Sequence, residues 1–522
     1  TGRAHFNQGW RKTRHHRTGL ESLQIIMQNR IWAFLFCLCA FTSCRTSRMH
    51  YPPDKKFSPT SLREDVEVLR GVLESHHPGL YWYQSRDKWN HNLQGVYQEL
   101  NDSLTELGLR KKLRQLTSSI RCGHTTIQSS RSIQQQNDTA TLQALFPISV
   151  KCWEDTMMVL GNLDIKDSVL NRGVQILSIN GRSAKQIIDT LSEYISGDGF
   201  NRTHPDQILS GWGSFGNYYR LYLDTSSQIM FNYLDRQGLE QSVIRSLYIP
   251  KKDATVRQPQ PALSRKEKKV QSLERIRSLQ IDTANRQALM RLNSFGENGK
   301  LRRFFRKGFQ LLEQNQIADL IIDVRNNGGG RVGNSTSFSR YISKRAFKVA
   351  DSLYAIRRHS KYGKYIQHNW AIQALMPFLT KKRKDGLYHF GYFERHRFSP
   401  KKKNHFDGRT YILTSGYSFS ATTLFINAVK GQPGVTVIGE ETGGGAYGNS
   451  AWEIPTVVLP NTRIRLKLPL FRMVMDKNGP NNGRGIFPDV EVGATPESIR
   501  LNYDNKMRVT QSLIQAARRK GS

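Results

Sequence analysis

The sequence predicts an α/β protein that begins with a helical domain, continues with a β-rich module and ends with an α/β sandwich. Three observations support this order. Apolar residues recur at helical spacing from about residue 61, and short strand-like runs follow between residues 145 and 250. Farther along, apolar strands near Ile321, Tyr411 and Val435 alternate with helical stretches, which is typical of parallel strands covered by helices.

The first domain is expected to open with a helix over residues 61–75. Ser61 and Glu64 form an S-x-x-E capping box at its start. Apolar side chains then follow on one helical stripe, namely Leu62, Val66, Leu69 and Leu73. Such a stripe predicts a helix that buries one face against its domain.

The β-rich module contains the segment RGVQILSINGRSA, residues 172–184, with the pattern of a strand, a tight turn and a helix. This pattern is similar to that of a PDZ-like module, which can add an extended peptide to its sheet edge. Residues 251–290 are rich in Lys, Arg, Gln and Pro. They are predicted to form a basic linker or an inserted arm.

Two strands of the last domain end in segments that suit catalysis. TSGYSFSATT, residues 414–423, leads from a strand end into a helix and places Ser420 at the turn. IADLIIDVRNNGGG ends at Gly330, and unhindered glycine N–H groups can point at an anion. Since ligands of parallel sheets bind at the carboxyl ends of strands, the two segments predict a nucleophile and an oxyanion hole.

Three blocks resemble the core of the C-terminal processing, or tail-specific, serine peptidases and their tricorn-like relatives. They are DVRNNGGG (323–330), SFSATTLF (418–425) and VIGEETGGG (437–445). The resemblance extends more weakly over roughly residues 60–500. It implies a crotonase/ClpP-like fold for the sandwich core.

The resemblance also implies roles for single residues. Ser420, which immediately precedes Ala421, would be the nucleophile, and Ser418 is its nearest competitor. The oxyanion would be held by the backbone N–H groups of Ala421 and of Gly329, with Gly330 as the second choice for the glycine.

The general base is expected to be a histidine. Gly445 stands where processing peptidases of the Ser/Lys type carry a lysine, and residues 440–452 contain no lysine. A serine hydroxyl without a base is a poor nucleophile at neutral pH. The tricorn-like branch uses an N-terminal histidine, and RCGHTTI supplies His124, whose near-neutral pKa suits proton transfer.

The sequence does not decide which residue is the third member of the catalytic group. Histidine-using relatives carry a glutamate in an E-G-x-G-x-x-P-D block, and here NGRGIFPD places Asn482 at that position. An amide can still orient an imidazole. Glu440, Glu441 and Asp489 remain alternatives.

Other active-site motifs do not fit the sequence. The segment GYSFS lacks the last glycine of a G-x-S-x-G elbow and would place the nucleophile at Ser418. No phosphate-binding loop follows the glycine run. Cys122 and His124 have no second Cys/His pair at zinc spacing, so no metal and no cofactor are expected.

The N-terminal residues predict an exported lipoprotein of the cell envelope that faces the periplasm. After Met27, the basic MQNR and the apolar IWAFLFCLCAF lead to FTSC, which resembles a lipoprotein signal cut before Cys44. The apolar run is shorter than the roughly 20 residues of a membrane-spanning helix. Cys122 and Cys152 are expected to remain after processing, and they could pair in an oxidising compartment.

The resulting order of segments is as follows: an upstream extension (1–26), a lipoprotein signal peptide (27–43), a helical N-terminal domain (44–140), a PDZ-like module (141–250), a basic linker or insertion (251–290), the catalytic core (291–500) and a helical tail (501–522).

The formal net charge is +36, spread over several basic runs. Charge of this kind favours solvated surface and contact with anionic lipid headgroups or acidic polymers. No recognition motif for nucleic acid accompanies it, so nucleic-acid binding is not expected.

Together these patterns predict a lipid-anchored serine endopeptidase that cleaves unfolded or C-terminal peptide segments through an acyl-enzyme. The alternative is a non-catalytic, peptide-binding lipoprotein that keeps the fold, for which Asn482 is the main argument. Hydrolysis of a non-peptide ester or amide is a third reading of the same site.

Overall fold

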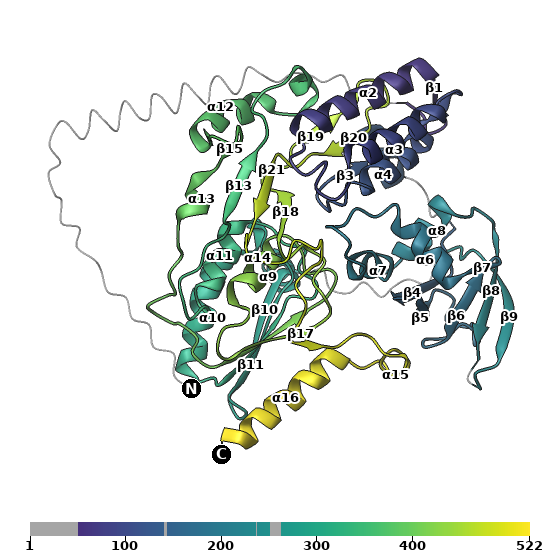
Figure 1. The fold of residues 1–522 in the computed structure, drawn as a ribbon. Coiled ribbons are helices and arrows are strands. Elements are labelled where there is room, and N and C mark those ends of the chain that lie inside the picture. Colours follow the sequence, from purple (N-terminus) through teal and green to yellow (C-terminus); the bar gives the residue numbers. More distant parts are fainter. Residues whose placement is uncertain (1–50, 140–143, 236, 251–262, 522) are drawn as a thin grey trace. The chain divides into compact units, whose positions relative to one another are not determined.

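The computed structural model describes residues 51–139, 144–235, 237–250 and 263–521 (Figure 1). By contacts, the chain divides into Thr1–Tyr51 and Pro52–Ser522, and the fold described below is that of the second unit. The predicted upstream extension, the signal peptide and Cys44 lie outside the described residues. No helix in the described part of the chain is long and apolar enough to cross a membrane.

The N-terminal domain is helical, as predicted. Its elements are β1 (Lys56–Phe57), α2 (Pro59–His76), α3 (Arg86–Gln98), β2 (Leu104–Thr105), α4 (Glu106–Ser118), β3 (Thr126–Gln128) and α5 (Arg131–Thr139). The expected apolar stripe of α2 is fully buried, which confirms the helical reading. The helix begins earlier than expected, because Pro59 occupies its first turn and Ser58 caps it by accepting a hydrogen bond from the Ser61 N–H.

The β-rich module follows the predicted order of strand, turn and helix. Its elements are β4 (Ile148–Trp153), β5 (Thr156–Asn162), β6 (Gln175–Ile179), β7 (Arg182–Ser183), α6 (Ala184–Ser192), α7 (Thr203–Leu209), α8 (Ser214–Tyr222), β8 (Gln228–Leu234) and β9 (Glu240–Ser246). The strands pair antiparallel in the order β4-β5-β6-β8-β9. Asn180 and Gly181 make the turn with positive φ, and a capping box between Ser183 and Gln186 starts α6.

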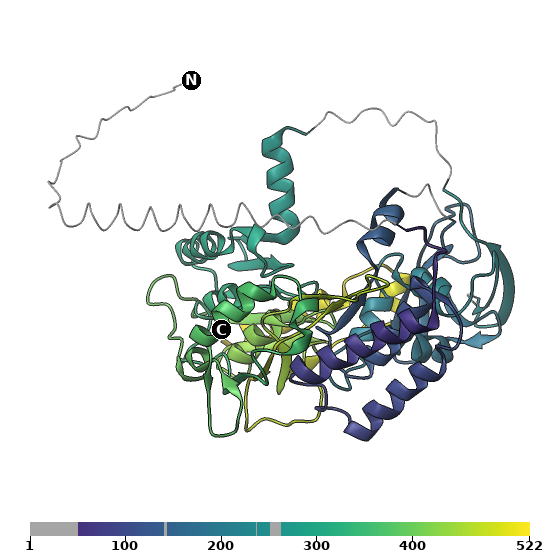
Figure 2. The ribbon, with the colours of Figure 1, turned by 90° about the horizontal axis from the view of Figure 1, so that it is seen from above.

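Much of the predicted linker is regular structure. Residues 251–262 lie outside the described part, but α9 (Arg265–Ile276), β10 (Arg277–Asp282) and the start of β11 (Gln287–Leu292) fall within 251–290. α9 has no buried residue and stands away from the sheet in Figure 2. β10 pairs along its length with β11, so the main sheet starts before residue 291. Charge-rich composition concealed this strand, whose half-buried Leu279 and Ile281 pack on the core.

The core is a sheet in the order β10-β11-β12-β16-β17-β22, parallel from β11 onward. The strands and the helices of this domain confirm the predicted α/β sandwich. They are β12 (Asp319–Asp323), β16 (Arg409–Thr414), β17 (Val435–Gly439), β22 (Val490–Glu491), η1 (Glu297–Gly299), α10 (Leu301–Gln314), α11 (Val332–Ser339), α14 (Ala421–Val429), α15 (Pro496–Arg500) and α16 (Asn505–Gly521).

Successive side chains of β12 point to opposite faces of the sheet, and helices cover both faces. Leu320 and Ile322 pack into an apolar cluster with α10, α11 and α14, whereas Ile321 packs on the opposite side with Ile514 of α16. Every residue of β12 is buried, which is typical of a parallel strand covered on both faces. The predicted helical tail therefore closes one side of the sandwich.

Two smaller antiparallel sheets complete the core. One has the order β14-β15-β13-β21-β18 and the other the order β19-β20-β3. Their elements, with the helices between them, are β13 (Ser352–Ala355), η2 (Lys361–Tyr365), α12 (Asn369–Leu379), β14 (Lys381–Lys382), β15 (Tyr388–His389), α13 (Gly391–Arg395), β18 (Gly448–Ala451), β19 (Thr456–Val458), β20 (Arg465–Lys467) and β21 (Phe471–Val474). The pairing of β3 with β20 ties the N-terminal domain to the core.

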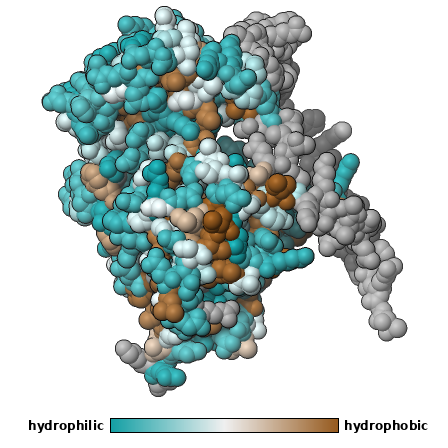
Figure 3. Space-filling view, turned by 90° about the vertical axis from the view of Figure 1, so that its right-hand side faces the viewer, coloured by the Kyte–Doolittle hydropathy of each residue, from teal (hydrophilic) through white to brown (hydrophobic). Residues whose placement is uncertain are grey.

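The surface drawn in Figure 3 is mostly hydrophilic, with apolar side chains in small groups between polar ones. The described cysteines, Cys122 and Cys152, are both buried free thiols and do not form the disulfide that was considered from the sequence.

Candidate active site

Ser420 lies in the turn between β16 and α14. Its φ is 55° and its ψ is −121°, a conformation that residues with a side chain rarely adopt. Strain of this kind persists only where the surrounding structure enforces it, and it concentrates at functional sites. Ser420 is half-buried, and its Oγ lies 3.1 Å from Nε2 of His124.

Ser418, the competing serine, is part of the turn that holds Ser420. Its side chain is fully buried. Its Oγ donates a hydrogen bond of 2.9 Å to the Val324 carbonyl and accepts one of 3.2 Å from the Ser415 N–H. Both bonds stabilise the loop after β12 against the loop after β16. The structure thus places Ser420, and not Ser418, opposite the histidine.

His124 reaches Ser420 because β3, just after it in the chain, pairs with the core strand β20. The imidazole packs against the ring of Phe419 at 5.2 Å between centroids. Burial lowers the pKa of His124 below its ordinary value, while the charge of Asp198 and a carbonyl contact at Ser450 act in the opposite direction. A histidine held neutral in this way can accept a proton.

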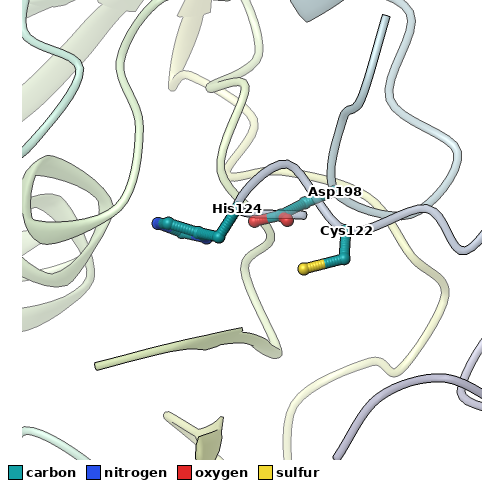
Figure 4. Close-up of side chains that lie close together, drawn as sticks. All are labelled: Cys122, His124 and Asp198. Carbon is teal, nitrogen blue, oxygen red and sulfur yellow. The ribbon is translucent and has the colours of Figure 1, made fainter. Parts of the chain in front are cut away.

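Asp198 is a neighbour of His124 that the sequence did not reveal. A ring nitrogen of His124, a carboxylate oxygen of Asp198 and the Cys122 Sγ all lie within 4.8 Å of one another (Figure 4). Nδ1 of His124 is buried and makes no hydrogen bond of good geometry in the described protein. A carboxylate this close to the ring stabilises the charged imidazole.

Backbone N–H groups hold the Asp198 carboxylate in place. One oxygen accepts from Gly123, the residue before His124, at 2.9 Å, and the other accepts from Gly445 at 3.3 Å. Gly445 is the position at which Ser/Lys relatives carry their base, so an aspartate occupies the neighbourhood of the missing lysine. The only sequence signal was an aspartate between two glycines, Gly197 and Gly199, which by itself is typical of a turn.

The structure pairs the other candidate acids with different groups. Glu440 accepts from Lys506 Nζ at 2.5 Å, and Glu441 accepts from the Gly485 N–H at 2.6 Å and from Arg484. Asp489 accepts from the Val437 N–H at 2.8 Å and pairs with Lys430.

Asn482 is exposed, and its Oδ1 accepts from the Arg484 N–H at 3.1 Å. No hydrogen bond joins it to His124 in the described residues. Its role as an orienting residue stays a prediction that this arrangement does not support.

The predicted oxyanion hole faces Ser420. Gly329 has a φ of 106°, and a Cβ on it would lie 2.7 Å from the Ser420 Cβ and 2.9 Å from the Ala421 nitrogen. Ala421 begins α14, and its N–H has no partner among the described residues, as expected at a helix start. The Gly329 N–H donates to Asn327 Oδ1 at 2.9 Å and would have to leave this bond to bind an oxyanion.

Gly330, the second choice, points elsewhere. A Cβ on it would lie 2.4 Å from the carbonyl carbon of Phe295 and from the Gly296 nitrogen. This backbone contact requires a glycine. The geometry therefore favours Gly329 beside the nucleophile and gives Gly330 a role in the packing of the loop.

Cys122, His124 and Asp198 are also residue types that bind zinc. Two of them already have partners, since Asp198 accepts from backbone N–H groups and Cys122 Sγ donates to the Ser450 carbonyl at 3.5 Å. Burial raises the pKa of Cys122 to about 11, which disfavours the thiolate that a metal needs. The group is better suited to orient an imidazole than to hold an ion.

Comparisons with known proteins bear on the family and the fold. Residues 286–492 match the sequence model of Peptidase family S41. Residues 286–492 form a peptidase family S41 domain. The match spans the sheet from β11 to β22 and includes Gly329 and Ser420, whereas His124 and Asp198 come from outside it. No curated protein sequence matches the chain significantly.

Solved structures share the fold of most of this chain. Mature CPAF matches with a TM-score of 0.59 at 14% identity, covering 85% of this chain and 94% of that one. Mature CPAF in complex with lactacystin matches with a TM-score of 0.61 at 14% identity, covering 88% and 98%. The photosystem II D1 C-terminal processing protease matches at 0.39, with 14% identity over 84% of this chain and 94% of its own. At this identity, the two matches to mature CPAF show a common fold.

Proposed function

We propose that this protein is a serine peptidase in which Ser420 is the nucleophile and His124 the general base. The observation that carries the proposal is the contact of 3.1 Å between Ser420 Oγ and His124 Nε2. These two atoms come from different domains and meet at a strained turn, next to an unpaired helix N–H. That combination supports nucleophilic catalysis.

In the first step, His124 Nε2 takes the hydroxyl proton while Ser420 Oγ bonds to the carbonyl carbon of the substrate. The carbonyl oxygen becomes an oxyanion beside the N–H groups of Ala421 and Gly329. His124 then gives its proton to the leaving amine as the C–N bond breaks, which leaves an acyl-enzyme on Ser420. A water then gives a proton to His124 as its oxygen attacks the acyl carbon, and His124 returns that proton to Ser420 Oγ as the ester bond breaks, which releases the acid. Each oxyanion donor typically contributes a factor of about 10² to 10³ in rate.

Asp198 is the third member of the proposed Ser420–His124 catalytic group. When Nε2 accepts the serine proton, Nδ1 carries the other hydrogen and faces the buried side of the imidazole. The carboxylate of Asp198 then stabilises the imidazolium that forms, as the acid of a serine triad does. Its hydrogen bond to the Gly123 N–H fixes it relative to the backbone of His124.

The expected substrates are unfolded or C-terminal peptide segments. A cavity of about 790 Å³ lies between α3, α4 and residues 197–202, but neither Ser420 nor His124 lines it, so it is at most a neighbouring binding surface for a longer chain. β9 is an edge strand of the PDZ-like sheet and can accept an added strand. The lactacystin complex of the structural relative CPAF supports ligand binding in this fold.

Labelling with a fluorophosphonate probe tests the proposal. The wild-type protein should form an adduct on Ser420 and hydrolyse an unfolded protein substrate, and Ser420→Ala should do neither. Ser418→Ala is the matched control, because Ser418 lies two residues away and does not contact His124; it should keep the adduct. A folded wild-type protein that takes no label would favour the non-catalytic, peptide-binding alternative.

We also propose that the protein is anchored in the cell envelope through lipid on Cys44. The support is the sequence alone, because the basic and apolar residues 27–43 precede that cysteine. Cys44→Ala should leave the precursor unprocessed and change its partitioning in membrane fractionation. Equal processing and partitioning of the two proteins would contradict the anchor.

A further inference from the structure

Helix α12 exposes an apolar face to solvent. Trp370, Leu375 and Phe378 have exposed fractions of 69%, 56% and 88%. Trp370, Ala374 and Phe378 are spaced four residues apart, so they form one stripe along the helix. Large apolar side chains that are grouped on one element usually mark a surface for a partner or a membrane.

The helix is fixed to the protein by its opposite side. Met376 is the buried residue of α12, and Thr380 just after the helix is buried as well. Thr380 Oγ1 donates to the Met376 carbonyl at 2.7 Å and accepts from Arg358 Nε at 3.1 Å. At the other end, η2 packs closely on the start of α12, since a Cβ on Gly363 would lie 2.4 Å from Asn369 Nδ2. The apolar stripe is therefore presented outward by an anchored helix.

Cationic residues flank both ends of α12. Residues 352–384 contain no Asp or Glu, and their basic side chains are Arg357, Arg358, Lys361, Lys364, Lys381, Lys382, Arg383 and Lys384. All five lysines of this segment are exposed, namely Lys361, Lys364, Lys381, Lys382 and Lys384. Arg358 and Arg383 are engaged, the first with Thr380 and the second in an ion pair with Glu394. α12 itself has no charged residue, but exposed Trp, Leu and Phe with lysines before and after the helix are the residue types by which interfacial helices bind anionic membranes.

We propose that α12 and its flanking lysines dock on an anionic lipid bilayer, with Trp370 and Phe378 at the headgroup boundary. The positive charge of the lysines favours an anionic bilayer over a second copy of the chain. A symmetric contact with a second copy would bring two sets of unbalanced cations together, which opposes association. An anionic bilayer instead gains both the apolar contact and the attraction of the lysines. The proposal is independent of the catalytic one, because none of these residues lies in the candidate active site.

Brominated lipids test the insertion of Trp370 directly. Bromine quenches tryptophan only at close range, so vesicles of brominated phosphatidylglycerol should quench the full-length protein, and Trp370→Phe should lose part of that quenching. Trp212→Phe is the matched control, because Trp212 is 74% exposed but lies in the β-rich module; the absolute intensity that bromine removes should stay as in the wild type. Quenching that is the same in the wild type and in Trp370→Phe would overturn the proposal.

Charge reversal tests the lysines. A triple variant with Lys381→Glu, Lys382→Glu and Lys384→Glu should partition about 100-fold less onto phosphatidylglycerol vesicles, since each cation near an anionic surface contributes about 1 kcal/mol. The matched control reverses Lys266, Lys268 and Lys269 on the exposed helix α9, an equal change in net charge. An equal loss in both triple variants would show a net-charge effect and contradict a specific surface.

Neutral vesicles and the oligomeric state separate the remaining outcomes. Binding to phosphatidylcholine vesicles should be much weaker and should not respond to the lysine variants. If light scattering instead shows a dimer that Trp370→Ser with Phe378→Ser dissociates, α12 is an interface between copies and the membrane proposal is wrong. Peptidase activity in solution should be equal in the wild type and in that double variant.

Discussion

Replacing Asp198 with Asn removes the negative charge beside His124. The side chain keeps its size and an oxygen that can accept from the Gly123 N–H. The carboxylate lies within 4.8 Å of a His124 ring nitrogen. At that distance, two unit charges attract each other by about 0.9 kcal/mol in water and about 3.5 kcal/mol in a protein-like dielectric. Because the imidazolium forms as the serine attacks, the loss should lower kcat by roughly 5-fold to 300-fold.

The pH profile separates this electrostatic role from a merely structural one. The Asp198 carboxylate raises the pKa of His124, so its removal should shift the acidic limb of the kcat profile to lower pH. KM should change little, since Asp198 does not reach the substrate in the proposed step. Steady-state cleavage of a fluorogenic peptide between pH 4 and 8 measures these quantities.

The matched control is Asp206→Asn. Asp206 is another buried aspartate that accepts a backbone hydrogen bond, from Glu154 at 3.2 Å, and burial raises its pKa to about 6. Because it does not face His124, its replacement should leave kcat and the acidic limb unchanged. An Asp198→Asn enzyme with wild-type kcat and an unshifted limb would refute the reasoning and return attention to Asn482.

Three further predictions concern the same site and its surroundings. His124→Ala should lower kcat by about 10² to 10⁴, and Ser420→Ala combined with it should be barely worse, as steady-state assays of the single and double variants will measure. Gly329→Ala should lower kcat about 100-fold or more because its Cβ would occupy the oxyanion space, whereas Gly431→Ala, which has positive φ and open space around it, should be neutral in the same assay. EDTA should leave activity unchanged, and a loss that Zn²⁺ restores would show that the cluster around His124 holds a metal.

Local patterns in the sequence determined most of the core. Apolar periodicity is a property of neighbouring residues, so the stripe of α2 and the buried strand β12 were predictable, and both are as expected. The turn at Ser420 and the glycine run ending at Gly330 were also predictable, because small residues and glycines directly after an apolar strand mark the point where the strand ends in a turn. Composition was a poorer guide where charge predominated, and for that reason strand β10 was mistaken for linker.

The tertiary structure decided which side chains lie next to His124 and Asn482. Nothing near Asp198 in the sequence indicates that its carboxylate meets His124, because the contact depends on how the loop after α6 lies against the turn before β3. The same is true of Asn482, which resembles a catalytic position in the sequence but is exposed and bonded to Arg484. Hydrogen bonds and charges act over a few ångströms in space, whereas sequence patterns report only neighbours along the chain. The strand-to-helix turn that carries Ser420 could therefore be predicted from sequence, and the position of Asp198 beside His124 could not.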